Sequence, residues 1–309
     1  MATYRILTFD SGGIKGLFSA TLLGRVVENH PDLIKNTDLI AGTSTGGIIA
    51  LGLAAGLTPQ QLAELYRDRG PEIFDDSFWD DLIDLGKAVG ADYSQKKLRS
   101  ELEDRLGRNT TLGDLNKRVL IPTFDLDSPE TGKRPRAWKP KFFHNFPGRD
   151  SDREESVVDV ALRTSAAPTY FPAYQGYIDG GVVANNPSMA AVAQAIDKRA
   201  GKQKLQNVVV LSIGTGLEPK YIATRRKHLD WGWTQWARPL IALMISGMTG
   251  VADFQCKQLL GDSYRRLDSV FDRGVDLDDV EPRTLDYLVE EATAVRITGV
   301  LRWLENVGW

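Results

Sequence analysis

The chain has 309 residues, of which 42% are apolar, and its 38 basic and 41 acidic side chains give a net charge of −3. This composition predicts a globular protein with a large core, and it offers no general attraction for nucleic acid or an anionic membrane. The single cysteine, Cys256, excludes an internal disulfide, and no apolar run reaches the roughly 20 residues that span a bilayer. No secretory leader is recognisable, so we expect a cytoplasmic protein.

Apolar periodicity and turn residues predict alternating strands and helices over the first two thirds of the chain. Strands are expected at residues 4–9, 38–42, 118–126, 137–145 and 207–216. Helices are expected at residues 15–29, 48–56, 59–69, 95–106, 157–165 and 187–199, with Ser156 or a neighbour capping the fifth. This alternation is typical of an α/β layer structure with mostly parallel strands. Beyond residue 216 the pattern is mainly helical.

The first predicted strand runs into "DSGGIKG", residues 10–16. A glycine-rich bend between a strand and a helix directs backbone N–H groups at an anion, either a bound phosphate or a transient oxyanion. The dinucleotide pattern G-x-G-x-x-G has Ser11 in place of its first glycine, and the second strand ends at Gly42 without the acid that would hold a ribose. No P-loop is present. A nucleotide-binding module is therefore an alternative that the motif supports poorly.

The second strand leads into "GTSTGG", which places Ser44 between Gly42 and Gly46. A G-x-S-x-G sequence between a strand and a helix is the nucleophile elbow of serine hydrolases. The tight turn brings neighbouring positions into close contact, which glycine permits, and Thr43 and Thr45 complete it. The serine hydroxyl is then exposed at a helix N-terminus, where negative charge is favoured.

A serine needs a base to become a nucleophile near neutral pH. The three histidines fit a surface or a satisfied core position better than a catalytic one: His30, His144 and His228. Asp179 is a better candidate, because it ends the apolar stretch "YFPAYQGYI" and two glycines follow it. Asp before glycine is also a common turn signal, so the residue pattern alone leaves both interpretations open.

Taken together, "DSGGIKG", "GTSTG" and "DGG" resemble the patatin-like phospholipase family, and the resemblance covers residues 4 to about 216. It implies a three-layer α/β/α sandwich with a mostly parallel central sheet, a modified α/β-hydrolase-like fold. It also implies a lipase or phospholipase A activity on acyl esters of phospholipids or other glycerolipids. The chain would divide into a catalytic α/β domain, 1–216, and a mainly helical extension, 217–309, packed on it.

The resemblance also implies a role for each motif. Ser44 would be the nucleophile and Asp179 its base, in a dyad without histidine, and the reaction would pass through an acyl-enzyme. Oxyanion-hole N–H groups would come from Gly12, Gly13 and Ile14. The DGG motif would continue through Gly180 and Gly181, and neither a metal nor a cofactor is required.

Ser11 is the position at which this chain departs from the family pattern, which has glycine there. The side chain could support the oxyanion hole or crowd it. The alternative to an enzyme is therefore a weak or inactive lipid-binding protein that keeps the fold.

The apolar segment at residues 239–251 follows Trp231, Trp233 and Trp236. Its stripe at helical spacing, Leu240, Leu243, Met244, Met248 and Val251 or Ala252, fits a core helix or a membrane-facing lid. The expected partners are the lipid substrate and a membrane contacted transiently and peripherally. A homo-oligomer and an unidentified regulatory ligand are further expectations, and nucleic acid is not expected.

Overall fold

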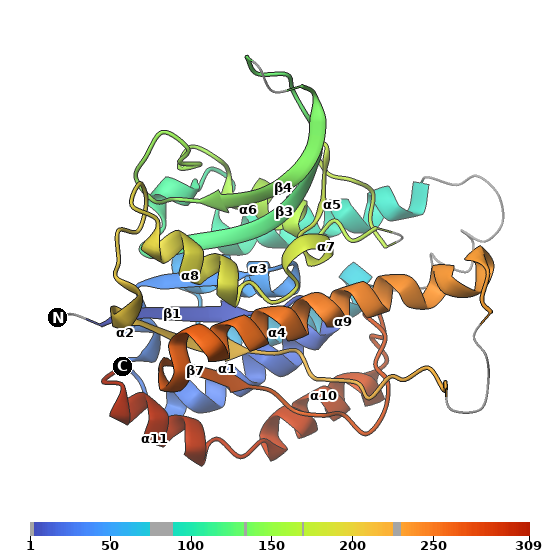
Figure 1. The fold of residues 1–309 in the computed structure, drawn as a ribbon. Helices are drawn as coiled ribbons and strands as arrows, with labels where there is room; N and C mark the ends of the chain where they lie inside the picture. Colours follow the sequence, from blue (N-terminus) through green and yellow to red (C-terminus); the bar gives the residue numbers. More distant parts are fainter. Residues whose placement is uncertain (1–2, 75–88, 133–134, 169, 225–229) are drawn as a thin grey trace.

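The computed structural model describes residues 3–74, 89–132, 135–168, 170–224 and 230–309. A central sheet lies between two layers of helices (Figure 1). Its strands are β1 Tyr4–Phe9, β2 Leu39–Gly42, β3 Arg118–Ser128, β4 Ala137–His144, β5 Tyr177–Asp179, β6 Val208–Ile213 and β7 Tyr264–Leu267. The helices are α1 Gly16–Asn29, α2 Leu33–Asn36, α3 Thr45–Ala55, α4 Pro59–Phe74, α5 Val89–Leu106, α6 Val157–Thr164, α7 Gly181–Ala184, α8 Ser188–Ile196, α9 Trp233–Leu260, α10 Pro282–Ala294 and α11 Thr298–Asn306.

The strands follow the order β4-β3-β2-β1-β6-β7, and β5 pairs with residues 123–125 of β3. The central neighbours β3, β2, β1, β6 and β7 are parallel, whereas β4 and β5 run antiparallel to β3. In the register of β1 with β2, Phe9 lies opposite Gly42. The turn after β1 and the turn after β2 therefore lie side by side at the carboxyl edge of the sheet, as the α/β prediction requires.

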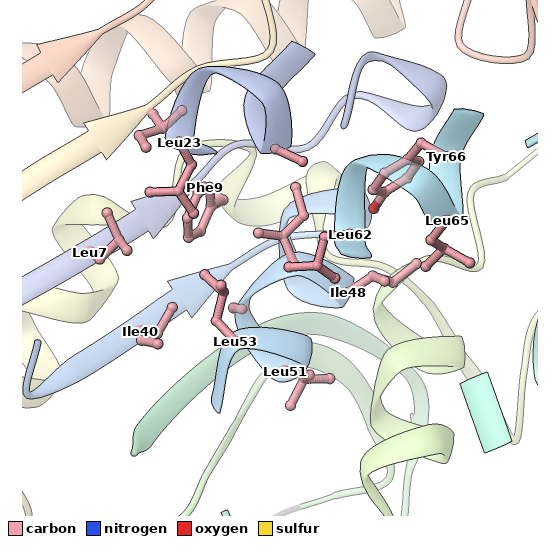
Figure 2. Packing of buried hydrophobic residues seen from close by; sticks show 14 of the residues in the cluster. Leu7, Phe9, Leu23, Ile40, Ile48, Leu51, Leu53, Leu62, Leu65 and Tyr66 are labelled. Carbon is pink, nitrogen blue, oxygen red and sulfur yellow. The ribbon is translucent and has the colours of Figure 1, made fainter. Parts of the chain in front are cut away.

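Alternate residues of each central strand pack into different helical layers, because successive side chains of a strand point to opposite faces. Leu7 and Phe9 join the larger cluster with α1, α3 and α4 (Figure 2). Ile6 joins the smaller cluster on the other face, with α8 and the carboxyl end of α9. The predicted three-layer α/β/α sandwich is confirmed.

The predicted helices and strands of the first two thirds are present, with α4 and α5 longer than expected. Ser156 is the N-cap of α6, and its side chain accepts a hydrogen bond from the Asp159 N–H at 3.3 Å. The mainly helical segment beyond residue 216 also contains β7, a strand that the sequence patterns did not predict. This strand extends the sheet parallel to β6.

Helix α9 lies across the molecule with one side turned outward. The exposed fractions of Leu240, Leu243, Met244 and Val251 are 39%, 46%, 56% and 55%. The core alternative is therefore wrong for these residues, and the helix packs instead through Ala252 and its neighbours on the opposite side. Within the described ranges, no helix is long and apolar enough to cross a membrane.

The end of the chain packs into the same core as its beginning. Trp309 is buried, and its indole N–H donates to the carbonyl of Leu33 at 3.0 Å. Arg25 of α1 donates to the carbonyls of Ala292 and Val295 at the end of α10. The division of the chain at residue 216 stays a prediction.

We expect Trp309→Ala to lower the free energy of unfolding by about 3 kcal/mol, because it removes a buried aromatic side chain together with a hydrogen bond. Tyr221→Ala, at an 88% exposed position, should change it by less than about 0.5 kcal/mol. Urea unfolding followed by fluorescence or circular dichroism measures both. Equal midpoints for Trp309→Ala and wild type would show that the terminus is not part of the core.

Candidate active site

Three turns from different parts of the chain surround one cavity. They are the glycine-rich turn after β1, the elbow between β2 and α3, and the turn after β5. The cavity is lined by Ser11, Gly13, Ser44, Thr45, Ile48, Leu98, Ser165, Ala167, Tyr170, Phe171, Asp179 and Leu277. Ser44 and Asp179 thus meet at one site, and the lining around them is mainly apolar.

The elbow holds Ser44 in a strained conformation. Its φ of 55° and ψ of −123° lie where side chains rarely occur, and it precedes the first residue of α3. Glycine is needed at both ends of the turn. A Cβ on Gly42 would lie 1.9 Å from the carbonyl oxygen of Gly46, and one on Gly46 would lie 2.4 Å from that of Phe9.

Hydrogen bonds fix the elbow from three sides. The Ser44 N–H donates to Oγ1 of Thr164 at 3.0 Å, and Thr43 donates through its hydroxyl to the carbonyl of Ala184 at 2.6 Å. On the third side, Oγ1 of Thr45 lies 2.6 Å from the hydroxyl of buried Tyr66. These contacts leave the Ser44 hydroxyl facing the cavity.

Asp179 is 4% exposed at the end of β5. Its backbone is held by pairing with Thr123 of β3, and Gly180 lets the chain pass close to that strand, since a Cβ there would lie 2.1 Å from the Pro122 carbonyl oxygen. The Gly181 N–H donates to Oδ1 of Asp179 at 2.6 Å. The carboxylate therefore has a fixed orientation.

Burial raises the pKa of Asp179 to about 6, although hydrogen bonds from the Ser44 side chain and the Gly181 N–H act in the opposite direction. Desolvation penalises the charged form, so the carboxylate accepts a proton more readily than one in water. An aspartate in water is a weak acceptor for a hydroxyl proton, so a base for Ser44 needs to be desolvated, and the buried position of Asp179 provides this.

The glycine-rich turn lies beside the elbow. Gly13 has a φ of 57°, and a Cβ on it would lie 2.3 Å from the carbonyl oxygen of Leu277, so glycine is required there. Within the described part of the chain, no hydrogen bond to a protein acceptor is recorded for the N–H of Gly12 or Gly13. Ile14 differs, because its N–H donates to the Leu277 carbonyl at 2.8 Å. This conformation does not support Ile14 as a third oxyanion donor.

Ser11 is anchored through its backbone on both sides. Its N–H donates to the carbonyl of Asn185 at 2.9 Å, and its own carbonyl accepts from the Thr215 hydroxyl at 2.9 Å. Its side chain lines the cavity, and its Oγ would be 3.2 Å from a Cβ placed on Gly181. The departure from glycine thus places a hydroxyl next to the DGG motif.

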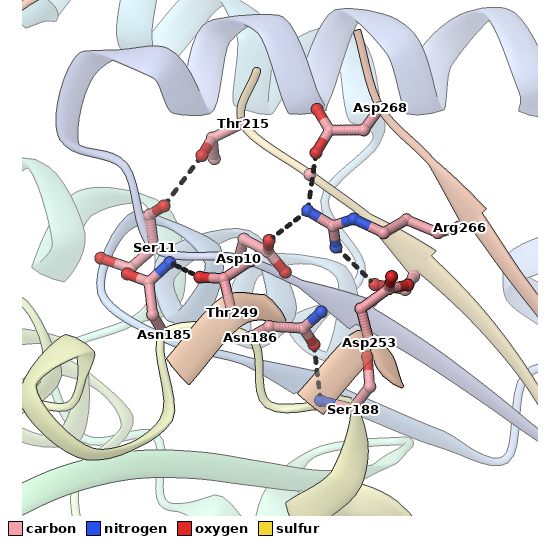
Figure 3. Close-up of polar contacts among 12 residues, drawn as sticks. Asp10, Ser11, Asn185, Asn186, Ser188, Thr215, Thr249, Asp253, Arg266 and Asp268 are labelled. Carbon is pink, nitrogen blue, oxygen red and sulfur yellow. Dashed lines mark hydrogen bonds and ion pairs between the residues drawn. The ribbon is translucent and has the colours of Figure 1, made fainter. Parts of the chain in front are cut away.

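Residues that the motifs did not indicate support this turn from the last third of the chain (Figure 3). Arg266 of β7 pairs with Asp10 at 2.7 Å and with Asp268 at 2.6 Å, and Asp268 accepts from the Gly216 N–H. Burial raises the pKa of Asp10 to about 6 against the opposing effect of Arg266. The carboxylate that begins "DSGGIKG" is thus held by a cation 256 residues away.

A second ion pair ties the same turn to the segment that carries Leu277. Lys15 pairs with Glu218 at 2.8 Å, and both side chains are largely buried. Glu218 also accepts from the Val275 N–H at 3.3 Å. No single motif could have indicated these contacts, because their members are distant in sequence.

Of the histidines within the described ranges, neither His30 nor His144 lines the cavity. His30 ends α1, and His144 ends β4, where burial lowers its pKa. His228 lies outside the described residues. Among the residues described, no cluster of three or more His, Cys, Asp or Glu side chains is arranged to hold a metal ion.

Comparison with known proteins is consistent with the three motifs. Protein teg of Priestia megaterium is 31% identical over 99% of both chains, and a putative sporulation hydrolase, CotR, of Bacillus subtilis is 32% identical over 99% of this chain and 98% of its own. A cGAMP-activated phospholipase of Pseudomonas aeruginosa is 35% identical over 86% of this chain and 78% of its own. The family model described as patatin-like phospholipase matches residues 7–192, a range that includes Ser44 and Asp179. The chain belongs to the patatin-like phospholipase family.

Proposed function

We propose that this protein is a serine acyl hydrolase of the lipase or phospholipase A type, with Ser44 as the nucleophile and Asp179 as its base. The observation that carries the proposal is that Ser44 lines the same cavity as the buried carboxylate of Asp179, whose pKa is raised by burial to about 6. Such a carboxylate is ionised at neutral pH and accepts a proton more readily than one in water. Membership of the family supports a lipid substrate.

In the first half of the reaction, Ser44 Oγ attacks the ester carbonyl carbon while its proton passes to Asp179. The proton transfer removes a negative charge from a desolvated site, so the burial that disfavours the carboxylate now assists the reaction. The tetrahedral intermediate collapses to an acyl-enzyme, and the departing alcohol takes the proton from Asp179. In the second half, water attacks the acyl group and gives a proton to Asp179, and Asp179 returns that proton to Ser44 Oγ as the fatty acid leaves.

The oxyanion of each intermediate needs donors that are in place before the reaction. Gly12 and Gly13 are the proposed donors, since the turn that carries them lies beside the elbow. The helix α3 begins at Thr45, and its N-terminal dipole also favours negative charge near Ser44. Ile14 could join them only if its hydrogen bond to Leu277 opened.

The mainly apolar lining of the cavity that holds Ser44 favours an acyl chain. Ile48, Leu98, Ala167 and Leu277 present apolar groups there, which suits a hydrocarbon chain and not a charged head group. We therefore place the fatty acyl portion of a phospholipid or glycerolipid in this cavity. Control by a ligand or by self-association stays a prediction, and the name of the Pseudomonas aeruginosa relative concerns that protein alone.

The alternative is a weak or inactive lipid-binding protein. Ser11 is the observation that favours it, because its side chain enters a cavity where the family pattern has none. Hydrolysis of a short-chain p-nitrophenyl ester by purified protein, and its loss after treatment with a serine-directed inhibitor, supports the enzyme. Binding of lipid without any such hydrolysis supports the alternative.

Ser44→Ala should reduce ester hydrolysis at least about a thousandfold, because the acyl-enzyme can no longer form. Ser165→Ala is the matched control: it alters another serine of the same cavity, whose hydroxyl already donates to the Ala161 carbonyl. The control should retain activity within about threefold. Equal losses in the two variants would point to damage to the cavity and against a role for Ser44 as nucleophile.

The pH dependence follows from the raised pKa of Asp179. The base works only when it is deprotonated, so kcat/KM for a soluble ester should be constant above pH 7 and fall about tenfold per unit below pH 6. Asp179→Asn should lose most of the activity, and the activity that remains should not show the fall in kcat/KM below pH 6. A wild-type profile that stays flat down to pH 4.5 contradicts Asp179 as the base.

The same raised pKa has a consequence for stability. A carboxyl whose pKa rises from 3.8 to about 6 on folding favours the folded state below pH 3.8, and that stability is lost as the pH rises to about 6. The free energy of unfolding of Asp179→Asn does not contain this contribution. Measured relative to that of wild type, it should therefore increase by about 2 kcal/mol when the pH is raised from 4 to 8. Urea unfolding at both pH values measures this. A difference that does not change with pH would show that Asp179 ionises as it does in water.

A further inference from the structure

We propose that the outer face of α9 is the surface through which this protein docks on a lipid bilayer, and this inference rests on the proposed lipid hydrolase function. The face carries an apolar stripe, defined as Leu240, Leu243, Met244, Val251 and Phe254. Their exposed fractions lie between 39% and 63%. Spacings of three, four and seven residues, from Leu240 to Leu243, from Leu240 to Met244 and from Met244 to Val251, place the stripe on one side of the helix.

An ordinary surface helix is apolar toward the core and polar toward water. The inner side of α9 follows that rule, because Ala252 is buried, Cys256 packs in the smaller core cluster, and Thr249 accepts a hydrogen bond from Asn185 at the end of α7. The outer side breaks it. From residue 239 to residue 252 the sequence contains no ionisable side chain, so this part of the helix contributes no charge to its exposed face. A second apolar face on a helix that is already packed indicates another contact.

The stripe is connected to the active site through the inner side of the same helix. The Asn185 side chain donates to Oγ1 of Thr249 at 2.7 Å, and the Asn185 carbonyl accepts from the Ser11 N–H. Ser11 lines the cavity that holds Ser44. In Figure 1 the amino-terminal end of α9, in orange, projects past the sheet. A surface that meets α9 would thus lie next to the glycine-rich turn.

The chemistry of the stripe fits a neutral membrane surface. Trp231 and Trp236 form an edge-to-face pair at its amino-terminal end, with ring centroids 5.1 Å apart, and tryptophan favours the bilayer interface. At the other end, Lys257 pairs with Asp253 at 2.6 Å, so their charges cancel. With a net charge of −3, the chain has no general attraction for anionic lipid. Zwitterionic phospholipid is therefore the occupant we assign.

A second copy of the chain is the competing occupant. The five side chains expose together roughly 500 Å², taking about 200 Å² for a fully exposed large apolar side chain. A stable interface between two proteins needs about 800 Å² from each partner. A narrow stripe of this size is better suited to insertion at the level of the lipid head groups, where a helix buries only one side.

The test measures co-sedimentation with phosphatidylcholine vesicles, using protein that carries Ser44→Ala so that lipid is not consumed. Met244→Gln with Phe254→Gln changes the two most exposed side chains of the stripe and should weaken partitioning at least about tenfold. The matched control is Leu126→Gln with Val270→Gln, at positions 39% and 65% exposed outside α9, and it should partition like the parent. Thermal unfolding verifies that each variant is folded.

A second measurement uses the same substitutions with Ser44 intact. Hydrolysis of a soluble short-chain ester should be unchanged, while hydrolysis of phosphatidylcholine in vesicles should fall about tenfold. Partitioning is measured on protein that cannot hydrolyse lipid. If the proposed hydrolase function were wrong, the vesicle experiment would therefore still test whether the stripe binds lipid.

Three results would overturn the proposal. The first is equal partitioning of the stripe variant and its parent, or partitioning onto anionic vesicles alone. The second is loss of partitioning with Trp138→Gln, at the 73% exposed tryptophan of β4, but not with the stripe variant. The third is a fall in oligomeric mass of the stripe variant in sedimentation equilibrium without any vesicle binding, which would assign the face to a second copy.

Discussion

The burial of the Asp179 carboxylate against the hydroxyl of Ser44 is the constraint on which the rest of the site depends. In water a carboxylate is a weak acceptor for a hydroxyl proton, and burial is what raises the pKa of this one to about 6. The cost of burying the charge is limited by two donors, the Ser44 side chain and the Gly181 N–H. The short strand β5 and its pairing with β3 keep the carboxylate in this position.

The parallel sheet supplies the second requirement, which is close approach of the turns. Because Phe9 and Gly42 end neighbouring strands in register, the glycine-rich turn and the elbow emerge together, and the Thr43 N–H donates to the Phe9 carbonyl at 3.2 Å. Two ion pairs then connect the glycine-rich turn to the last third of the chain. Arg266 on Asp10 and Glu218 on Lys15 connect it to β7 and to the loop after β6. The geometry of the proposed active site thus depends on segments from the first and last thirds of the chain and not on the motifs alone.

The sequence was sufficient wherever local chemistry determines structure. Alternating apolar strands and helices predicted the layers, and the glycines around Ser44 predicted the elbow, because only glycine permits that approach. The sequence was insufficient to predict structure that depends on contacts between residues far apart in the chain. The strand β7, "YRRL", has two arginines in four residues and forms because Tyr264 and Leu267 pack while Arg266 meets two carboxylates. Likewise, the spacing of the apolar residues predicted the stripe of α9. The spacing alone could not determine whether that side of the helix packs on the core or faces outward.

The most direct measurement is the labelling of the protein with a fluorophosphonate, with the modified residue located by peptide mass spectrometry. If Asp179 activates Ser44, one phosphonyl group should attach to Ser44, and the rate should rise with pH through a single ionisation near 6. Asp179→Asn should slow the labelling while leaving the protein folded. Attachment to another residue, or labelling of Ser44 at the same rate with and without the Asp179 carboxylate, would contradict the dyad.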